Sequence, residues 1–162
     1  MNLTKLEDFK CSSYIIKHSN AVLKKAKTIS KDFDVNLDHV EAGAILHDVG
    51  RSKTQSIYHA LKGAEILKEQ EFPIEIVKIT ERHIGAGIPK EEAIMLNLPP
   101  RDYLPITFEE KIVAHADNLI HGTKEVSLDF VIQKWSKKMG RKHPSLERLI
   151  KLHHELFYNI KL

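Results

Sequence analysis

Apolar residues recur at helical spacing along nearly the whole chain, and no stretch shows the sustained apolar–polar alternation of a β-strand. Residues 12–33 carry Ile15, Val22, Ala26 and Ile29 in such a pattern. Because a helix of this kind has one apolar stripe, each segment must bury its stripe against others. The sequence therefore predicts an all-α fold of about nine helices and no sheet.

Capping residues, glycines and prolines set the expected helix boundaries. Asp38 and Thr107, each three residues before a glutamate, are typical N-caps. Gly50 and Gly122 are expected to end helices. The helices are predicted near residues 12–33, 38–49, 59–70, 73–84, 90–97, 107–121, 127–139 and 145–160.

The segment 85–106 interrupts this helical pattern. It contains Gly85 and Gly87, and the stretch LPPRDYLPI near its end holds three prolines, which lack a backbone donor and restrict the preceding residue. We expect it to form a largely irregular excursion near the functional site. Because specificity is often determined by loops on a rigid scaffold, this segment is predicted to shape substrate choice.

Length and composition favour one globular domain. The 162 residues are 42% apolar and 29% charged, which is ordinary globular usage and enough to bury a core. We interpret residues 1–162 as a single domain with a core at about 14–122, on which C-terminal helices within 127–160 pack. The sequence does not predict the oligomeric state.

Charge and cysteine content exclude several classes. The net charge of +3 is too small to indicate nucleic-acid binding, and Arg141-Lys142-His143 is interpreted as a solvated loop. Cys11 is the only cysteine, so no intrachain disulfide can form. The N-terminal MNLTKLEDFK lacks a signal-peptide pattern, and no apolar run is long enough to span a membrane. These features predict a cytoplasmic protein that binds neither membranes nor nucleic acid.

The strongest local signal is His47-Asp48 at the end of an apolar helix, in the sequence AILHDVGR. Burial of this ionisable pair is costly unless something compensates it. A divalent cation compensates it well, since it accepts imidazole nitrogen and carboxylate oxygen together. An HD dipeptide alone is common by chance, so its significance depends on other ligands.

Suitable partners occur on other predicted helices. His18 lies on an earlier helix, and Asp117 lies in the apolar sequence KIVAHADNLI. His59 and His83 each stand at a helix end, and each is followed shortly by a small residue. The chain holds ten histidines, and histidine is the commonest metal ligand.

The ordered set resembles the HD/HDIG superfamily of metal-dependent phosphohydrolases over roughly residues 14–122. The likeness is closest to small archaeal HDIG proteins without a settled activity. A bacterial HD enzyme that splits symmetrical diadenosine tetraphosphate is also similar around His59, but not after His83. The resemblance implies these metal ligands: His18, His47, Asp48, His59, His83 and Asp117.

The resemblance also implies one or two divalent ions, with iron or manganese favoured and zinc, nickel or cobalt acceptable to such ligands. Asp48 is expected to hold the ions, while a metal-activated water attacks phosphorus. Arg51, directly after the HD turn, is predicted to be catalytic with Asp48 and to bind substrate phosphate. Lys53 and Arg82 are further candidates for substrate binding.

The expected activity is hydrolysis of a phosphate ester or anhydride in a small nucleotide-like substrate. A 2′,3′-cyclic phosphodiesterase using the same site, a non-catalytic ligand-sensing module and a di-iron oxygenase are alternative interpretations. His59 and His83 could also lie around a single ion without coordinating it. The sequence does not decide between monoester, cyclic diester and dinucleoside polyphosphate substrates.

Overall fold

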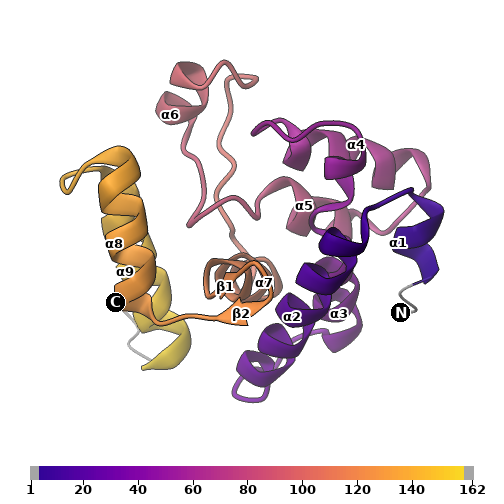
Figure 1. Cartoon of the computed structure of the whole chain (residues 1–162), viewed down its shortest axis with the longest axis horizontal. Helices are drawn as coiled ribbons and strands as arrows, with labels where there is room; N and C mark the ends of the chain where they lie inside the picture. The colour runs from indigo at the N-terminus through magenta and orange to yellow at the C-terminus, as the bar shows by residue number, and fades with distance from the viewer. Residues whose placement is uncertain (1–3, 159–162) are drawn as a thin grey trace.

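The computed structural model describes residues 4–158, and this part of the chain is almost entirely helical (Figure 1). The predicted all-α fold of about nine helices is confirmed. The helices are α1 (Thr4–Asp8), α2 (Ser13–Ser30), α3 (Leu37–Leu46), α4 (His59–Glu69), α5 (Ile74–Glu81), α6 (Lys90–Met95), α7 (Phe108–Asn118), α8 (Leu128–Met139) and α9 (Pro144–Phe157). A short 3₁₀ helix, η1 (Val49–Ser52), follows α3.

Helices α2, α3, α5 and α7 pack together to form the centre of the molecule. Their apolar stripes meet in a core in which Val22, Val40, Ile79 and Ile112 are buried. Figure 1 shows α7 near the centre, with α2 and α3 to one side and the α8–α9 pair to the other. This arrangement brings the ends of α3 and α5 toward the side of α7.

Side-chain N-caps begin several of these helices. The Thr107 hydroxyl accepts a hydrogen bond from the Glu110 N–H at 3.2 Å, so this predicted cap is confirmed. The predicted cap at Asp38 is wrong, because Asn36 accepts from the His39 N–H at 3.1 Å and α3 begins at Leu37. Asn and Asp are both good caps, and only the register of the turn distinguishes them.

A two-stranded hairpin corrects the prediction of no sheet. α7 ends at Asn118 instead of continuing through His121, and β1 (Ile120–His121) pairs antiparallel with β2 (Lys124–Glu125). Gly122 makes the turn with a φ of 66°, a conformation that glycine adopts readily. Each strand has two residues, which is too short for an alternating pattern to be visible in the sequence.

Gly50 has a different role from the predicted one. α3 already ends at Leu46, and Gly50 lies within η1. A Cβ at Gly50 would lie 1.8 Å from the His59 carbonyl oxygen and 2.5 Å from the Gly63 nitrogen. The absence of a side chain at Gly50 therefore lets η1 pack directly on α4, next to the HD pair.

The excursion 85–106 is more ordered than predicted. It contains α6, and the Ile88 and Tyr103 backbones exchange hydrogen bonds of 3.1 and 2.7 Å. Ile88 and Tyr103 belong to a small apolar cluster with Ala93 and Leu98. The excursion thus has its own core and projects at the top of Figure 1.

The last helix, α9, ends at Phe157, and residues 159–160 of the helix predicted over 145–160 lie outside the described residues. α8 and α9 pack against each other, and α9 also contacts α7. Between residues 4 and 158, the structure contains no helix with the length and apolar character needed to cross a membrane.

Candidate metal centre

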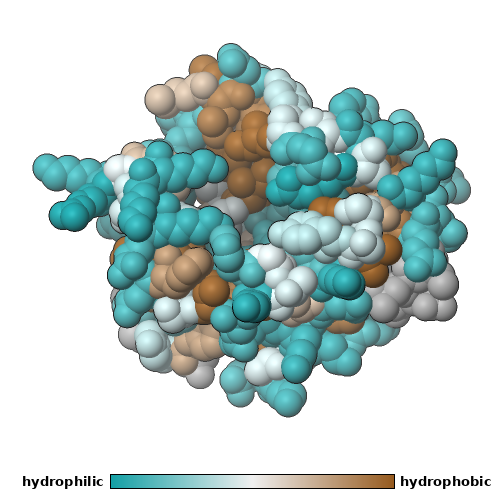
Figure 2. Space-filling model, viewed as in Figure 1, coloured by the Kyte–Doolittle hydropathy of each residue, from teal (hydrophilic) through white to brown (hydrophobic). Residues whose placement is uncertain are grey.

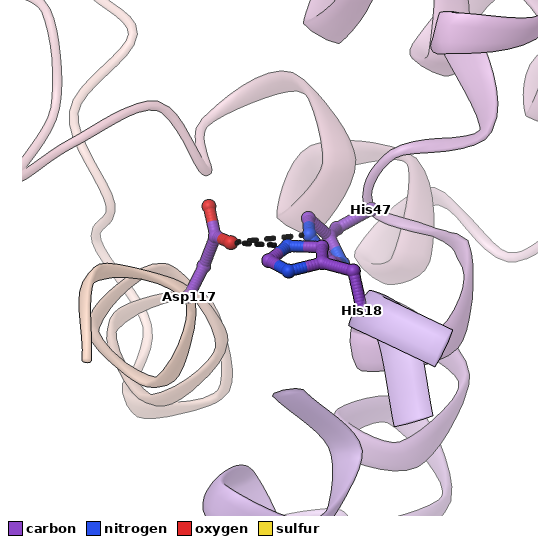
Figure 3. Close-up of side chains that lie close together, drawn as sticks. All are labelled: His18, His47 and Asp117. Atoms are coloured by element: carbon purple, nitrogen blue, oxygen red, sulfur yellow. Dashed lines mark hydrogen bonds and ion pairs between the residues drawn. The ribbon is translucent and has the colours of Figure 1, made fainter. Parts of the chain in front are cut away.

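The structure brings five segments of the chain together around the HD pair. His18 comes from α2, His47 caps the C-terminus of α3, and Asp117 lies on α7. The His18 Nε2 atom lies 2.9 Å from Asp117 Oδ1, and His47 Nε2 lies 3.4 Å from the same oxygen (Figure 3). These three side chains thus point at one location.

Asp48 connects this group to a second one. Its Oδ2 atom lies 3.5 Å from His47 Nε2 and 3.6 Å from His18 Nε2. Its Oδ1 atom lies 3.2 Å from His59 Nε2 and 3.3 Å from His83 Nε2. The six residues predicted from the sequence therefore lie together, with the Asp48 carboxylate between the two groups.

All four histidines are oriented by backbone carbonyls. The Nδ1 atoms of His47, His59 and His83 each lie 2.7–2.8 Å from the carbonyl three residues earlier, which belongs to Ala44, Ser56 and Thr80 respectively. The Nδ1 atom of His18 lies 2.6 Å from the Gly122 carbonyl. Since a carbonyl only accepts, each Nδ1 carries the proton, and each Nε2 of a neutral ring directs a lone pair inward.

This donor set fits a divalent cation. Among the described residues, the buried His47 Nε2 atom has no hydrogen-bond partner. The Nε2 atoms of His59 and His83 lie 3.2 Å apart, where two inward lone pairs would repel. Two groups have ligand atoms within 4.8 Å of one another: His18, His47 and Asp117, and His47, Asp48 and His83. Imidazole nitrogens with orienting hydrogen bonds and nearby carboxylates are a typical ligand set for divalent metals.

In the metal-free cluster, burial and the charges of close neighbours shift the pKa values of the histidines and aspartates. Burial disfavours protonation of His47, but the charges of Asp48 and Asp117 outweigh it and hold its pKa well above the ordinary value. Burial likewise disfavours ionisation of Asp117, but His47 and His18 hold its pKa well below the usual range. For His83, burial dominates and lowers the pKa. When no metal cation is bound, the His47 imidazole therefore holds a proton between the two carboxylates.

The three predicted phosphate-binding cations lie in different environments. Arg51 Nε is 3.2 Å from Asp48 Oδ1, and Arg51 is partly exposed beside the centre. Lys53 is exposed after η1 and joins none of the ion pairs formed by residues 4–158. Arg82 Nη1 lies 3.0 Å from both carboxylate oxygens of Glu110, which is only 3% exposed, so this guanidinium is held in a structural ion pair.

The carbonyls that orient the rings were absent from the sequence prediction. Where the carbonyl belongs to the residue three positions before a histidine at a helix end, the contact is local, and the sequence could have predicted it. The Gly122 carbonyl had no such signal, because it reaches His18 across 104 positions through the unpredicted hairpin. Glu110 was predicted as a capping residue, but its side chain accepts from Ile106 N–H and pairs with Arg82.

Fold and site together define a helical protein with a buried histidine–carboxylate cluster that could hold a metal ion. Residues 15–121 match the HD domain family. This chain belongs to that family, whose members are metal-dependent phosphohydrolases.

Two curated archaeal proteins are similar to this chain over most of its length. An uncharacterised protein of Methanocaldococcus jannaschii, MJ0778, is 52% identical over 151 residues, which cover 90% of this chain and 89% of that protein. A tRNA (cytidine(56)-2′-O)-methyltransferase of Thermoplasma volcanium is 45% identical over 148 residues, which cover 91% of this chain but 43% of that protein.

A solved structure has the same fold. The HD domain of the L. monocytogenes phosphodiesterase PgpH, in complex with cyclic-di-AMP, has a TM-score of 0.56 over 91% of this chain and 93% of that one. The two sequences are 18% identical, so this similarity concerns the fold.

Proposed function

We propose that this protein hydrolyses a phosphate ester or anhydride bond in a nucleotide-like substrate by means of a metal-activated water. The observation that carries this proposal is the set of four histidines whose Nδ1 atoms are all bonded to carbonyls and whose Nε2 atoms surround Asp48 and Asp117. Such pre-orientation reduces the cost of assembling a metal site. Membership of the HD family supports the reaction class.

The ligand assignment follows the two groups around Asp48. His18, His47, Asp48 and Asp117 would hold one divalent ion, and His59 and His83 would hold a second, with Asp48 shared. Iron and manganese are the favoured metals. Divalent cations at such a centre lower the pKa of a water molecule and neutralise charge on phosphoryl oxygens.

Arg51 is assigned to substrate phosphate. Its Nε atom forms an ion pair with Asp48 Oδ1 at 3.2 Å, which holds the guanidinium beside the proposed metal ligands. The Nη1 atom donates to the Gln55 carbonyl and to Gln55 Oε1 at 3.5 and 3.4 Å, which leaves Nη2 of this charged group for a phosphoryl oxygen. Lys53, exposed two residues later at the end of η1, is a second candidate cation. We assign no substrate role to Arg82, because Glu110 occupies its guanidinium.

The test is a substrate panel assayed with manganese or ferrous ion. Phosphomonoesters, 2′,3′-cyclic nucleotides, cyclic dinucleotides and dinucleoside polyphosphates separate the substrate classes. We expect metal-dependent turnover of at least one class, and a loss of about 100-fold or more in Asp117→Asn, which keeps the side-chain shape but removes the ligand charge. Turnover restricted to 2′,3′-cyclic nucleotides would favour the cyclic phosphodiesterase. Tight nucleotide binding without turnover of any class would overturn the proposal in favour of a ligand-sensing module.

A further inference from the structure

The positive charge of the protein is concentrated in its C-terminal helix pair. Residues 128–157 contain seven lysines and arginines against three aspartates and glutamates, whereas the whole chain has 25 against 22. The rest of the chain is therefore close to neutral. A net charge of +3 conceals this asymmetry.

Three of these cations lie on one exposed face of α8, and a fourth follows just after the helix. Phe130, Lys134 and Lys138 follow one another at four-residue spacing with Lys137 beside them, and Arg141 comes directly after the C-cap Gly140. All five are exposed, and Phe130 is 40% exposed although it is a large apolar residue. We call these residues the α8 basic face: Phe130, Lys134, Lys137, Lys138 and Arg141.

The first turns of this face contact the hairpin that orients one residue of the cluster. Lys134 Nζ is 3.4 Å from His121 Nδ1, and the rings of His121 and Phe130 are 5.3 Å apart. His121 immediately precedes Gly122, whose carbonyl orients the metal ligand His18. The α8 basic face thus begins at the hairpin that supports the ligands.

A second contact ties α8 to the other side of the centre. Trp135 packs against Gly85, where an added Cβ would lie 3.2 Å from the indole ring. Gly85 follows His83 by two residues. Figure 2 shows a hollow in this face of the molecule, between hydrophilic side chains over α8 and hydrophobic side chains over α6 and the segment below it.

We propose that the α8 basic face binds a single-stranded oligonucleotide whose chain continues from the metal centre. This inference rests on the proposed function, because it places the reacting phosphate at that centre. A line of cations with exposed rings at one end is the arrangement that binds successive phosphates and stacks bases. It departs from the expectation of no nucleic-acid partner, which rested on the small net charge and on the interpretation of Arg141-Lys142-His143 as a solvated loop.

The geometry favours an oligonucleotide over a single phosphate group, an acidic peptide or a membrane surface. Lys134 and Lys138 are one helical turn apart, about 6 Å along the axis of α8, so their two ammonium groups can contact separate phosphates. An acidic peptide would not use the His121 and Phe130 rings. A membrane surface would require more apolar side chains beside the cations, and Phe130 and Met139 are the exposed large apolar residues of α8.

The test measures binding of a 5′-fluorescein-labelled 12-nucleotide oligo(U) by fluorescence anisotropy, in EDTA and from 50 to 300 mM KCl. We expect Lys134→Gln/Lys138→Gln/Arg141→Gln to weaken binding at least tenfold at low salt. For this variant, the slope of log Kobs against log[KCl] should fall in magnitude by about 2, since each phosphate contact with a single strand contributes about 0.7. Phe130→Ala should weaken binding roughly tenfold with little change in slope, because stacking carries no charge.

The matched control is Lys24→Gln/Lys31→Gln/Lys68→Gln, which removes three exposed cations from α2, its C-cap and α4. This control should bind like the wild type. Equal weakening in both triple variants, no effect in either, or equally tight binding of polyglutamate or phosphatidylglycerol vesicles would overturn the inference. Hydrolysis of bis(p-nitrophenyl) phosphate by the manganese-loaded protein tests the proposed function separately. Oligonucleotide binding without any hydrolysis would contradict that function but not the binding surface.

Discussion

The Nε2 atoms of His59 and His83 lie 3.2 Å apart, and both lie within 3.3 Å of Asp48 Oδ1. Their Nδ1 atoms donate to the carbonyls of Ser56 and Thr80, so in neutral rings both inward nitrogens present lone pairs. Two such lone pairs at this distance require a proton or a cation between them. The pair is therefore the structural basis for expecting a second ion beside the one held by His18, His47 and Asp117.

His59→Gln and His83→Gln are expected to reduce the number of bound manganese ions from two to one. Each substitution removes one ligand of the second ion but leaves the first ion's ligands intact. Metal content after dialysis, measured by elemental analysis, checks this. If both variants keep the wild-type stoichiometry, His59 and His83 do not hold an ion.

Arg82 and Arg51 should respond oppositely to the same substitution. Arg82→Gln would leave the buried Glu110 carboxylate without its ion-pair partner, and we expect a stability loss of about 3 kcal/mol. Arg51→Gln should instead raise KM for phosphate substrates with little change in unfolding, because Arg51 is partly exposed. Urea denaturation and steady-state kinetics on both variants separate the roles. An Arg82→Gln variant that is as stable as the wild type but has a raised KM would contradict this account and indicate that Arg82 binds substrate.

Gly50→Ala should destabilise the protein strongly, by about 3 kcal/mol or more, because the new methyl group would overlap the His59 carbonyl and force η1 away from α4. Displacement of η1 would also move Asp48 and reduce metal affinity. Gly122→Ala is the control: its φ of 66° is left-handed, and an added Cβ would meet only the Tyr14 hydroxyl at 3.6 Å, so about 1 kcal/mol of backbone strain is expected. Equal losses in the two variants, measured by chemical denaturation, would contradict this packing.

His115 should make the metal-free protein acid-sensitive. Burial, with the charges of His153 and Lys25, lowers the His115 pKa to about 3, compared with about 6.5 in an unfolded chain. The unfolded state therefore binds more protons between these values, and stability falls as pH falls below 6.5. Between pH 7 and pH 5 this group alone should cost about 2 kcal/mol.

The measurement is the free energy of unfolding in EDTA at pH 7 and pH 5, for the wild type and His115→Gln. The variant should lose about 2 kcal/mol less than the wild type on acidification, whatever its stability at pH 7. His83 and His153, whose pKa values are also lowered by burial, contribute in the same direction in both proteins. An identical pH dependence in both proteins would show that His115 does not titrate as described.

Several residues of the candidate metal centre were predictable from the sequence because their signals are local. His47-Asp48 follows an apolar helix, and His59 and His83 stand at helix ends where their own turns orient the rings. Thr107 was recognised as a cap for the same reason. Each of these features depends on residues within four positions, where propensities and spacing are informative.

The features that were missed depend on contacts across the chain. The hairpin of two-residue strands has no periodic signature, so neither it nor the Gly122 carbonyl bound to His18 was expected. Arg82 looked like a free cation because its partner Glu110 is 28 residues away. The basic face of α8 was hidden by averaging charge over the chain. Tertiary packing, and not local sequence, determines each of these.

Anomalous diffraction from manganese-soaked crystals is the most direct test of the metal centre. We expect a peak within coordination distance of the Nε2 atoms of His18 and His47 and of an Asp117 oxygen. A second peak should lie among Asp48, His59 and His83. A map with no peak among these residues, or with manganese bound only at surface carboxylates, would contradict the assignment of this cluster as a metal centre.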